Sequence, residues 1–87
     1  MKETIERIRR MERLFDEVRS ALADGKDMQP LQGKIKALER YMTDGQWLLD
    51  YERDERGVLP VELVRGVLSQ DALYDLLAEL DEKEKMR

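Results

Sequence analysis

The residues best placed to do chemistry are four carboxylates close together in the chain, Asp50, Glu52, Asp54 and Glu55. Carboxylate oxygens bind calcium and magnesium, and the spacing Asp50-x-Glu52-x-Asp54 is that of the first ligands of a calcium-binding loop. The EF-hand register fails, however, because its glycine would fall on Glu55 and its final bidentate acid on Val61. We therefore interpret the four acids as the solvated end of a helix.

Two further pairs of acids would hold magnesium only if they faced each other across two helices: Glu79 with Glu82, and Glu12 with Asp16. Charged helix faces produce such spacings by chance, so a magnesium-dependent nucleotide hydrolase is kept only as an alternative. The chain contains no His and no Cys, which removes Ser-His-Asp and Cys-His nucleophiles, zinc fingers and thiol redox centres. We expect a protein that is not an enzyme, with no catalytic residue, cofactor or metal site.

Length and composition favour a single helical domain over residues 1–87. Of its 87 residues, 41% are charged and 41% are hydrophobic. A chain of this size buries a modest core, so we expect self-association, most simply as a homodimer. No apolar run approaches the roughly 20 residues of a membrane span, and the first residues open into a charged helix without a secretory core. We therefore expect a cytoplasmic protein that does not contact a membrane.

Apolar periodicity predicts an all-α fold. We expect a small bundle of two or three longer helices, with short helices around 46–56 and 60–65. The predicted buried stripes are Ile5, Ile8, Met11, Phe15, Val18 and Leu22 in the first helix, Leu31, Ile35, Leu38 and Met42 in the second, and Leu73, Leu76, Leu77 and Leu80 in the last.

Capping residues set the expected boundaries of the first two helices. The first helix covers roughly residues 2–23 and stops at Asp24-Gly25, because glycine readily takes the left-handed conformation of a helix end. The second begins near Met28, with Asp27 as its N-cap and Pro30 in its first turn.

The later boundaries rest on similar signals. Thr43-Asp-Gly-Gln46 matches a capping box and predicts a break followed by a new helix. Ser69 is the predicted N-cap of the last helix, with Leu68 stapled against Leu73. Apolar spacing is lost after Leu80, so we expect fraying over about 81–87.

Three aromatic side chains divide into two groups. Trp47 and Tyr51 lie one turn apart, and we expect them to fill the space between the two longer helices with their polar tips at the rim. Tyr74 lies off the leucine stripe of the last helix, which makes it a better candidate for a surface contact.

Arg65 lies between two expected helices, where it would either cap carbonyl groups or pair with Asp50 or Asp54. Pairing is favoured, because arginine and carboxylate groups form geometrically specific forks. The candidate protein-contact residues are Tyr74, Arg65, Asp71 and Asp75.

Charge is unevenly distributed along the chain. Residues 1–40 carry ten basic and eight acidic groups, whereas residues 41–87 carry six basic and twelve acidic groups, giving a net charge of -4. Nucleic-acid binding requires a basic stripe, and the arginines of the first helix are offset by nearby glutamates, so we expect no direct nucleic-acid contact. A protein partner with a basic surface is the more natural expectation.

Two motifs carry a resemblance to a known family. They are W-L-x-D-Y-E-x-D-E-x-G-x-L-P from Trp47 to Pro60 and R-G-V-L-S-x-D-A-x-Y-D-L-L from Arg65 to Leu77. With them the chain resembles a bacterial family of small proteins catalogued only as a domain of unknown function. The resemblance covers Ile5 to Leu80 and implies an all-helical fold and a bacterial or phage origin, but no mechanism.

Three functions therefore remain open. The leading one is a non-enzymatic protein-protein interaction module that contacts its partner through residues 47–75. The second is an acidic decoy or inhibitor of a nucleic-acid-handling protein, of the phage type, and the third is the magnesium-dependent hydrolase. In the decoy, the phosphate mimics would be Asp71, Asp75, Glu79 and Glu82.

Overall fold

The first helix, α1 (Lys2–Ala23), is the longest element of the described chain. The computed structural model describes residues 1–69 and 71–85. The predicted stripe of α1 is confirmed, because Ile8, Met11, Phe15, Val18 and Leu22 are buried and Ile5 packs against the core. The helix ends as predicted at Gly25, whose φ is +70°. The N–H groups of Gly25 and Lys26 bond back to Leu22 and Ala21 in a Schellman motif.

A 3-10 turn, η1 (Gln29–Leu31), precedes the second helix, α2 (Gln32–Thr43). Asp27 caps this turn, since its Oδ1 accepts the Gln29 N–H at 3.1 Å. Of the predicted stripe, Ile35 and Leu38 are buried, whereas Met42 is half-buried and Tyr41 beside it is almost fully buried.

The break between α2 and α3 (Gln46–Glu55) lies where the capping box predicted it, but the cap is different. Thr43 makes no bond to α3. Gly45 is the N-cap with a φ of +91°, and the Oδ1 of Asp44 accepts the Gln46 N–H at 3.0 Å. Asp44 competes successfully because an aspartate readily accepts from the N–H two residues on.

Residues 60–65 are not helical, so the short helix predicted there is wrong. A single turn forms, in which the Leu63 N–H donates to the Pro60 carbonyl at 3.2 Å. The helical turn comes later, as the 3-10 segment η2 (Gly66–Leu68). Beyond this turn, the Pro60 and Val61 carbonyls accept from the Arg65 side chain, so they are not free for the N–H groups of a continuing helix.

The last helix, α4 (Ala72–Lys85), begins three residues after Ser69, so the predicted Ser69 N-cap is also wrong. Ser69 is extended, with a ψ of 135°, and the residue before α4 is Asp71, whose φ is +72°. Aspartate tolerates this left-handed conformation better than most residues. Leu68 and Leu73 are both buried, as the predicted staple requires.

The helix α4 continues past Leu80 to Lys85, through most of the stretch predicted to fray; residues 86–87 lie outside the described part. Lys83 and Lys85 in its last turn suit the negative end of the helix dipole.

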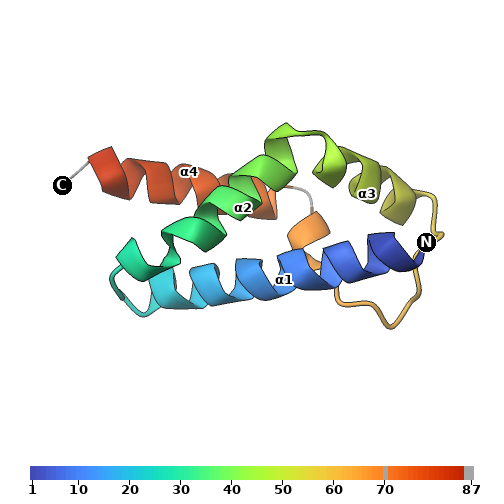
Figure 1. Ribbon diagram of the computed structural model, residues 1–87, viewed down its shortest axis with the longest axis horizontal. Coiled ribbons are helices and arrows are strands. Elements are labelled where there is room, and N and C mark those ends of the chain that lie inside the picture. Colours follow the sequence, from blue (N-terminus) through green and yellow to red (C-terminus); the bar gives the residue numbers. More distant parts are fainter. Residues whose placement is uncertain (70, 86–87) are drawn as a thin grey trace.

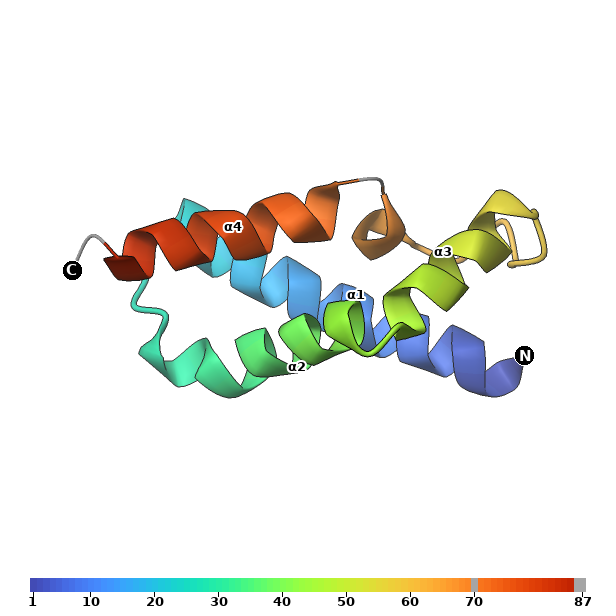
Figure 2. The same cartoon turned by 90° about the horizontal axis from the view of Figure 1, so that it is seen from above.

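The four α-helices of the described residues form an elongated bundle that measures 42 × 20 × 18 Å. Figure 1 shows α2 running back over α1, with α3 above the N-terminal half of α1 and α4 at the opposite end of the molecule. The η2 turn lies between them and contacts α1, α3 and α4. Figure 2, from above, shows α2 and α4 as two separate rods with α1 between and beneath them. In the described residues, no helix is both long and apolar enough to cross a membrane.

Candidate functional site

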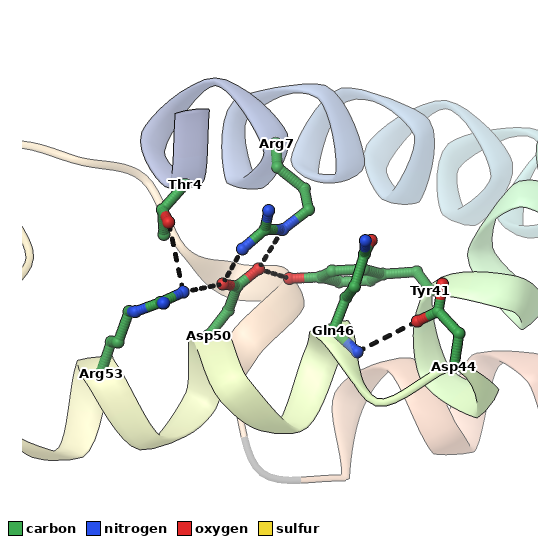
Figure 3. A network of polar contacts seen from close by, with 7 residues as sticks. All are labelled: Thr4, Arg7, Tyr41, Asp44, Gln46, Asp50 and Arg53. Atoms are coloured by element: carbon green, nitrogen blue, oxygen red, sulfur yellow. Dashed lines mark hydrogen bonds and ion pairs between the residues drawn. The ribbon is translucent and has the colours of Figure 1, made fainter. Parts of the chain in front are cut away.

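Asp50 is fully buried, although the sequence placed it among solvated acids. Its Oδ2 accepts hydrogen bonds from the Arg7 Nε at 2.9 Å and the Tyr41 hydroxyl at 2.7 Å. Its Oδ1 accepts from the Arg7 Nη2 at 2.6 Å and the Arg53 Nη1 at 3.2 Å. Figure 3 shows these groups converging from α1, α2 and α3 on one carboxylate. A carboxylate has about four acceptor sites, and all are used here, so Asp50 is not free to act as a base.

The same network shifts the pKa of its partners. The pKa of Tyr41 is raised well above its usual value, first by burial of the phenol and then by its hydrogen bond to Asp50. The hydrogen bond to Asp50 likewise raises the pKa of Arg7. Tyr41 is therefore neutral and Arg7 charged throughout the physiological range. The network is an electrostatic clamp between three helices rather than proton-transfer machinery.

A second buried acid, Glu12, holds the η2 turn. Its Oε1 accepts the Val67 N–H at 2.8 Å, and the Val67 carbonyl accepts the indole N–H of Trp47 at 2.9 Å. The backbone of one residue is thus fixed by side chains from α1 and α3. This removes Glu12 from the pair of acids considered for magnesium, because its oxygen is already used within the fold.

Trp47 and Tyr51 do stack on each other, with ring centroids 5.1 Å apart. Trp47 packs against the core, and its indole N–H donates to the Val67 carbonyl of η2. The residue that reaches in from α2 is Tyr41, which the sequence analysis did not single out. On the outer side, the neighbouring Glu55 raises the pKa of the Tyr51 phenol, with smaller effects from Asp54 and Asp71.

Arg65 is a structural residue that both caps and pairs. Its Nη1 lies 2.6 Å from the Asp54 Oδ1, which confirms one of the two predicted partners. Its Nη2 donates to the carbonyls of Pro60 and Val61 at 3.2 and 3.4 Å. Arg65 therefore ties the end of α3 to the segment that follows it.

The other predicted contact residues lie at the start of α4. Tyr74 is 64% exposed, and Asp71 and Asp75 are exposed as well. Asp71 directly precedes α4 with a left-handed backbone, and Tyr74 and Asp75 are adjacent residues of its first turn, about 100° apart around the helix axis. The structure does not bring Arg65 to them.

The two most exposed large apolar side chains of the described residues, Val61 and Val64, are not among the predicted contact residues. They belong to residues 58–64, here called the valine loop, in which Val58, Val61 and Val64 are 50%, 91% and 67% exposed. Leu59 and Leu63 of the same loop are buried. The i, i+3 spacing of these valines favours a short helix with one apolar face, which hides their exposure from a reading of the sequence.

The described residues contain no group of three or more acids placed to hold a metal ion. Glu52 and Glu55 are exposed on the outer side of α3, whereas Asp50 and Asp54 are engaged by arginines. Each buried side-chain nitrogen or oxygen in this part of the chain has a hydrogen-bond partner. The polar groups of the interior are thus accounted for by the fold.

Comparison with known proteins finds one match, to a family model. No curated protein and no solved structure matches the chain significantly. A family model does match, over residues 8–86, which is nearly the whole chain. The all-helical fold and the motif-bearing region from Trp47 to Leu77 lie within that match. The chain belongs to the family described as a domain of unknown function, DUF4298.

Proposed function

We propose that this protein is a non-enzymatic interaction module that binds a protein partner through the valine loop. The observation that carries the proposal is the exposure of three valines on a loop that the fold holds in place. Val61 has 91% of its surface exposed, although an apolar side chain gains free energy by leaving water. Isolated exposed apolar residues are common, but three within seven residues of one loop concentrate the kind of apolar surface that marks interfaces.

Buried side chains and backbone hydrogen bonds hold the valine loop in place. Leu59 and Leu63 anchor it in the core, and Arg65 bonds to two of its carbonyls. In Figure 1 the segment between α3 and η2 passes around the N-terminal end of α1. A loop that is already fixed loses little conformational entropy on binding, which favours its use as a docking surface.

The charges around the loop indicate the kind of partner. The exposed charged residues nearby in the chain are Glu52, Glu55, Glu62 and Arg56, so acids outnumber bases. We infer a partner surface that is apolar at its centre and carries lysine or arginine at its rim, because rim charges of opposite sign steer association. This matches the acidic character of residues 41–87.

Position-specific photo-crosslinking tests the proposal. A photoreactive amino acid is placed at Val61, and at Lys36 on the exposed side of α2 as the control. We expect one discrete crosslinked protein from Val61 and not from Lys36, and its loss when Val64→Asp is added. Circular dichroism must show the same helix content in all variants. Equal crosslinking from both positions would contradict the proposal.

The valine loop could instead bind a second copy of the chain, because a small core favours self-association. Sedimentation of the purified protein distinguishes the two cases. A monomer at micromolar concentration is the result expected for a loop reserved for another protein. A dimer that dissociates in Val61→Asp, with self-crosslinks from position 61, would replace the partner proposal with a homodimer.

The acidic decoy is a second candidate, favoured by one observation. Asp75, Glu79 and Glu82 are exposed at spacings of four and three residues along α4, and Asp71 just before the helix is exposed as well. In this case the crosslink should come from position 79 instead of position 61, and the affinity should fall steeply with salt. A partner captured from position 61 with little salt dependence would exclude the decoy.

A further inference from the structure

The Asp50 network contains two guanidinium groups and one carboxylate. Arg7 and Arg53 both bind the Asp50 Oδ1, at 2.6 and 3.2 Å, and Tyr41 contributes a neutral hydroxyl. The ionic groups of the network therefore carry one positive charge in excess. Neither arginine is fully covered, because the Arg7 side chain is 19% exposed and the Arg53 side chain 34%.

The exposed sides of both arginines line one hollow of about 580 Å³ between the start of α1 and α3. Its volume falls in the range of small-molecule sites, although it is open to solvent. Lys2 adds a third cation, and Glu3 is the only acid among the lining residues. Thr4 and Gln46 add polar groups, and Figure 3 shows Gln46 reaching from α3 toward α1 beside Arg7.

We propose that this hollow binds a small phosphate-bearing anion. The lining carries three positive side chains, Lys2, Arg7 and Arg53, and one negative side chain, Glu3. When the buried carboxylate of Asp50 is also counted, the net charge around the hollow is one positive charge. This surplus is notable in a protein whose net charge is -4. Arginines fixed in orientation present N–H groups that fit phosphate oxygens, and a phosphate monoester carries close to two negative charges at neutral pH.

The fixed orientation comes from the fold itself. Asp50 holds Arg7 by two parallel bonds, and the Arg53 Nη1 also donates to the Thr4 hydroxyl at 3.2 Å. An incoming anion would therefore meet guanidinium groups that are already ordered, and less side-chain entropy is lost on binding.

The test is a titration of isotope-labelled protein with sodium phosphate, followed by the backbone amide spectrum at constant ionic strength. We expect saturable shifts at Thr4, Arg7, Gln46 and Arg53, and no such shifts with sodium chloride or sodium acetate. Titration with glycerol 3-phosphate distinguishes the two sources of the phosphate group. Tighter binding of this compound assigns the site to a phosphate monoester, and tighter binding of inorganic phosphate assigns it to the free ion.

Charge-changing variants tie the binding to the hollow. Lys2 is exposed and its side chain forms no hydrogen bond or ion pair within the described residues, so Lys2→Gln should leave the fold intact and weaken binding about threefold. Arg53→Gln should weaken it about tenfold or more, and Glu3→Gln should strengthen it. The matched controls are Arg56→Gln at the end of α3 and Lys36→Gln on α2, both at exposed positions outside the hollow.

Three results would overturn the proposal. They are shifts that track ionic strength alone, acetate binding as tightly as phosphate, or the same weakening in Arg56→Gln and Lys36→Gln as in the hollow variants. None of them depends on the valine loop, so the two proposals stand or fall separately.

Discussion

Arg7 and Asp50 form a bidentate pair across 43 residues of sequence, with N···O distances of 2.9 and 2.6 Å. The pair joins the first helix to the third at a point where the carboxylate has no contact with water. Burying one charge without its partner is costly, so the pair locks the relative position of the two helices. The Arg7–Asp50 ion pair, which holds two helices together, is the central polar feature of the molecule.

Asp50→Ala should destabilise the fold by about 3–5 kcal/mol, because it leaves Arg7 and the Tyr41 hydroxyl without their shared acceptor. The change is measured by urea denaturation followed by circular dichroism. Glu52→Ala, two residues away and exposed, is the control and should cost less than about 0.5 kcal/mol. Similar losses in both variants would contradict the clamp.

The alkaline stability of the protein should depend on Tyr41. The folded pKa of this phenol is raised above the unfolded value, so its contribution is complete below pH 10 and is lost as the pH rises further. Melting temperatures at pH 8–11.5 should fall at the upper end in the natural chain and fall less in Tyr41→Phe. Tyr74→Phe removes an exposed phenol and should keep the full decline.

Glu12 and Gly66 should be energetically coupled. A Cβ at position 66 would lie 3.2 Å from the Glu12 Oε2, closer than ordinary van der Waals contact. Gly66→Ala should therefore destabilise the natural chain by about 1–2 kcal/mol. In a Glu12→Ala background that penalty should shrink, since the obstructing carboxylate is gone.

A double-mutant cycle from four unfolding curves measures this coupling. Glu12→Ala alone should cost about 1–3 kcal/mol, because the buried Val67 N–H loses its acceptor. Strict additivity of the two changes would show that the cost of a side chain at position 66 does not arise from the Glu12 carboxylate.

Arg65→Gln should release the valine loop without unfolding the bundle. The bonds from Arg65 to Asp54, Pro60 and Val61 would be lost or weakened. Hydrogen exchange at the Leu63 amide should accelerate by roughly tenfold or more, while exchange in α1 stays slow. Arg56→Gln is the matched control, and unchanged exchange at Leu63 in Arg65→Gln would mean that Leu59 and Leu63 alone hold the loop.

Much of the helical framework could be predicted from apolar periodicity. The stripe of α1 and its end at Gly25 are local properties, because they depend on residues within one or two turns. The first residues of the helices were harder to predict. Asp44, and not Thr43, accepts the N–H at the start of α3, and Asp71, and not Ser69, directly precedes α4. Several short polar side chains compete for such positions, and packing decides among them.

The buried polar groups could be predicted only in part. Glu12 lies four residues after Ile8 and three before Phe15, so helical spacing alone places it on the buried face. Asp50 could not be placed in the same way, because its partners Arg7 and Tyr41 come from other helices. Long-range polar contacts of this kind depend on how the helices are packed, which the local sequence does not encode.

The hydrogen bond from the Trp47 indole to the Val67 carbonyl gives the protein a built-in optical probe. The chain has one tryptophan, and its ring is fixed where α3 meets the η2 turn that also contacts α1 and α4. Opening of this junction would expose the indole to water and move its fluorescence emission to longer wavelength. Assembly of the whole bundle can therefore be followed by stopped-flow fluorescence without any added label.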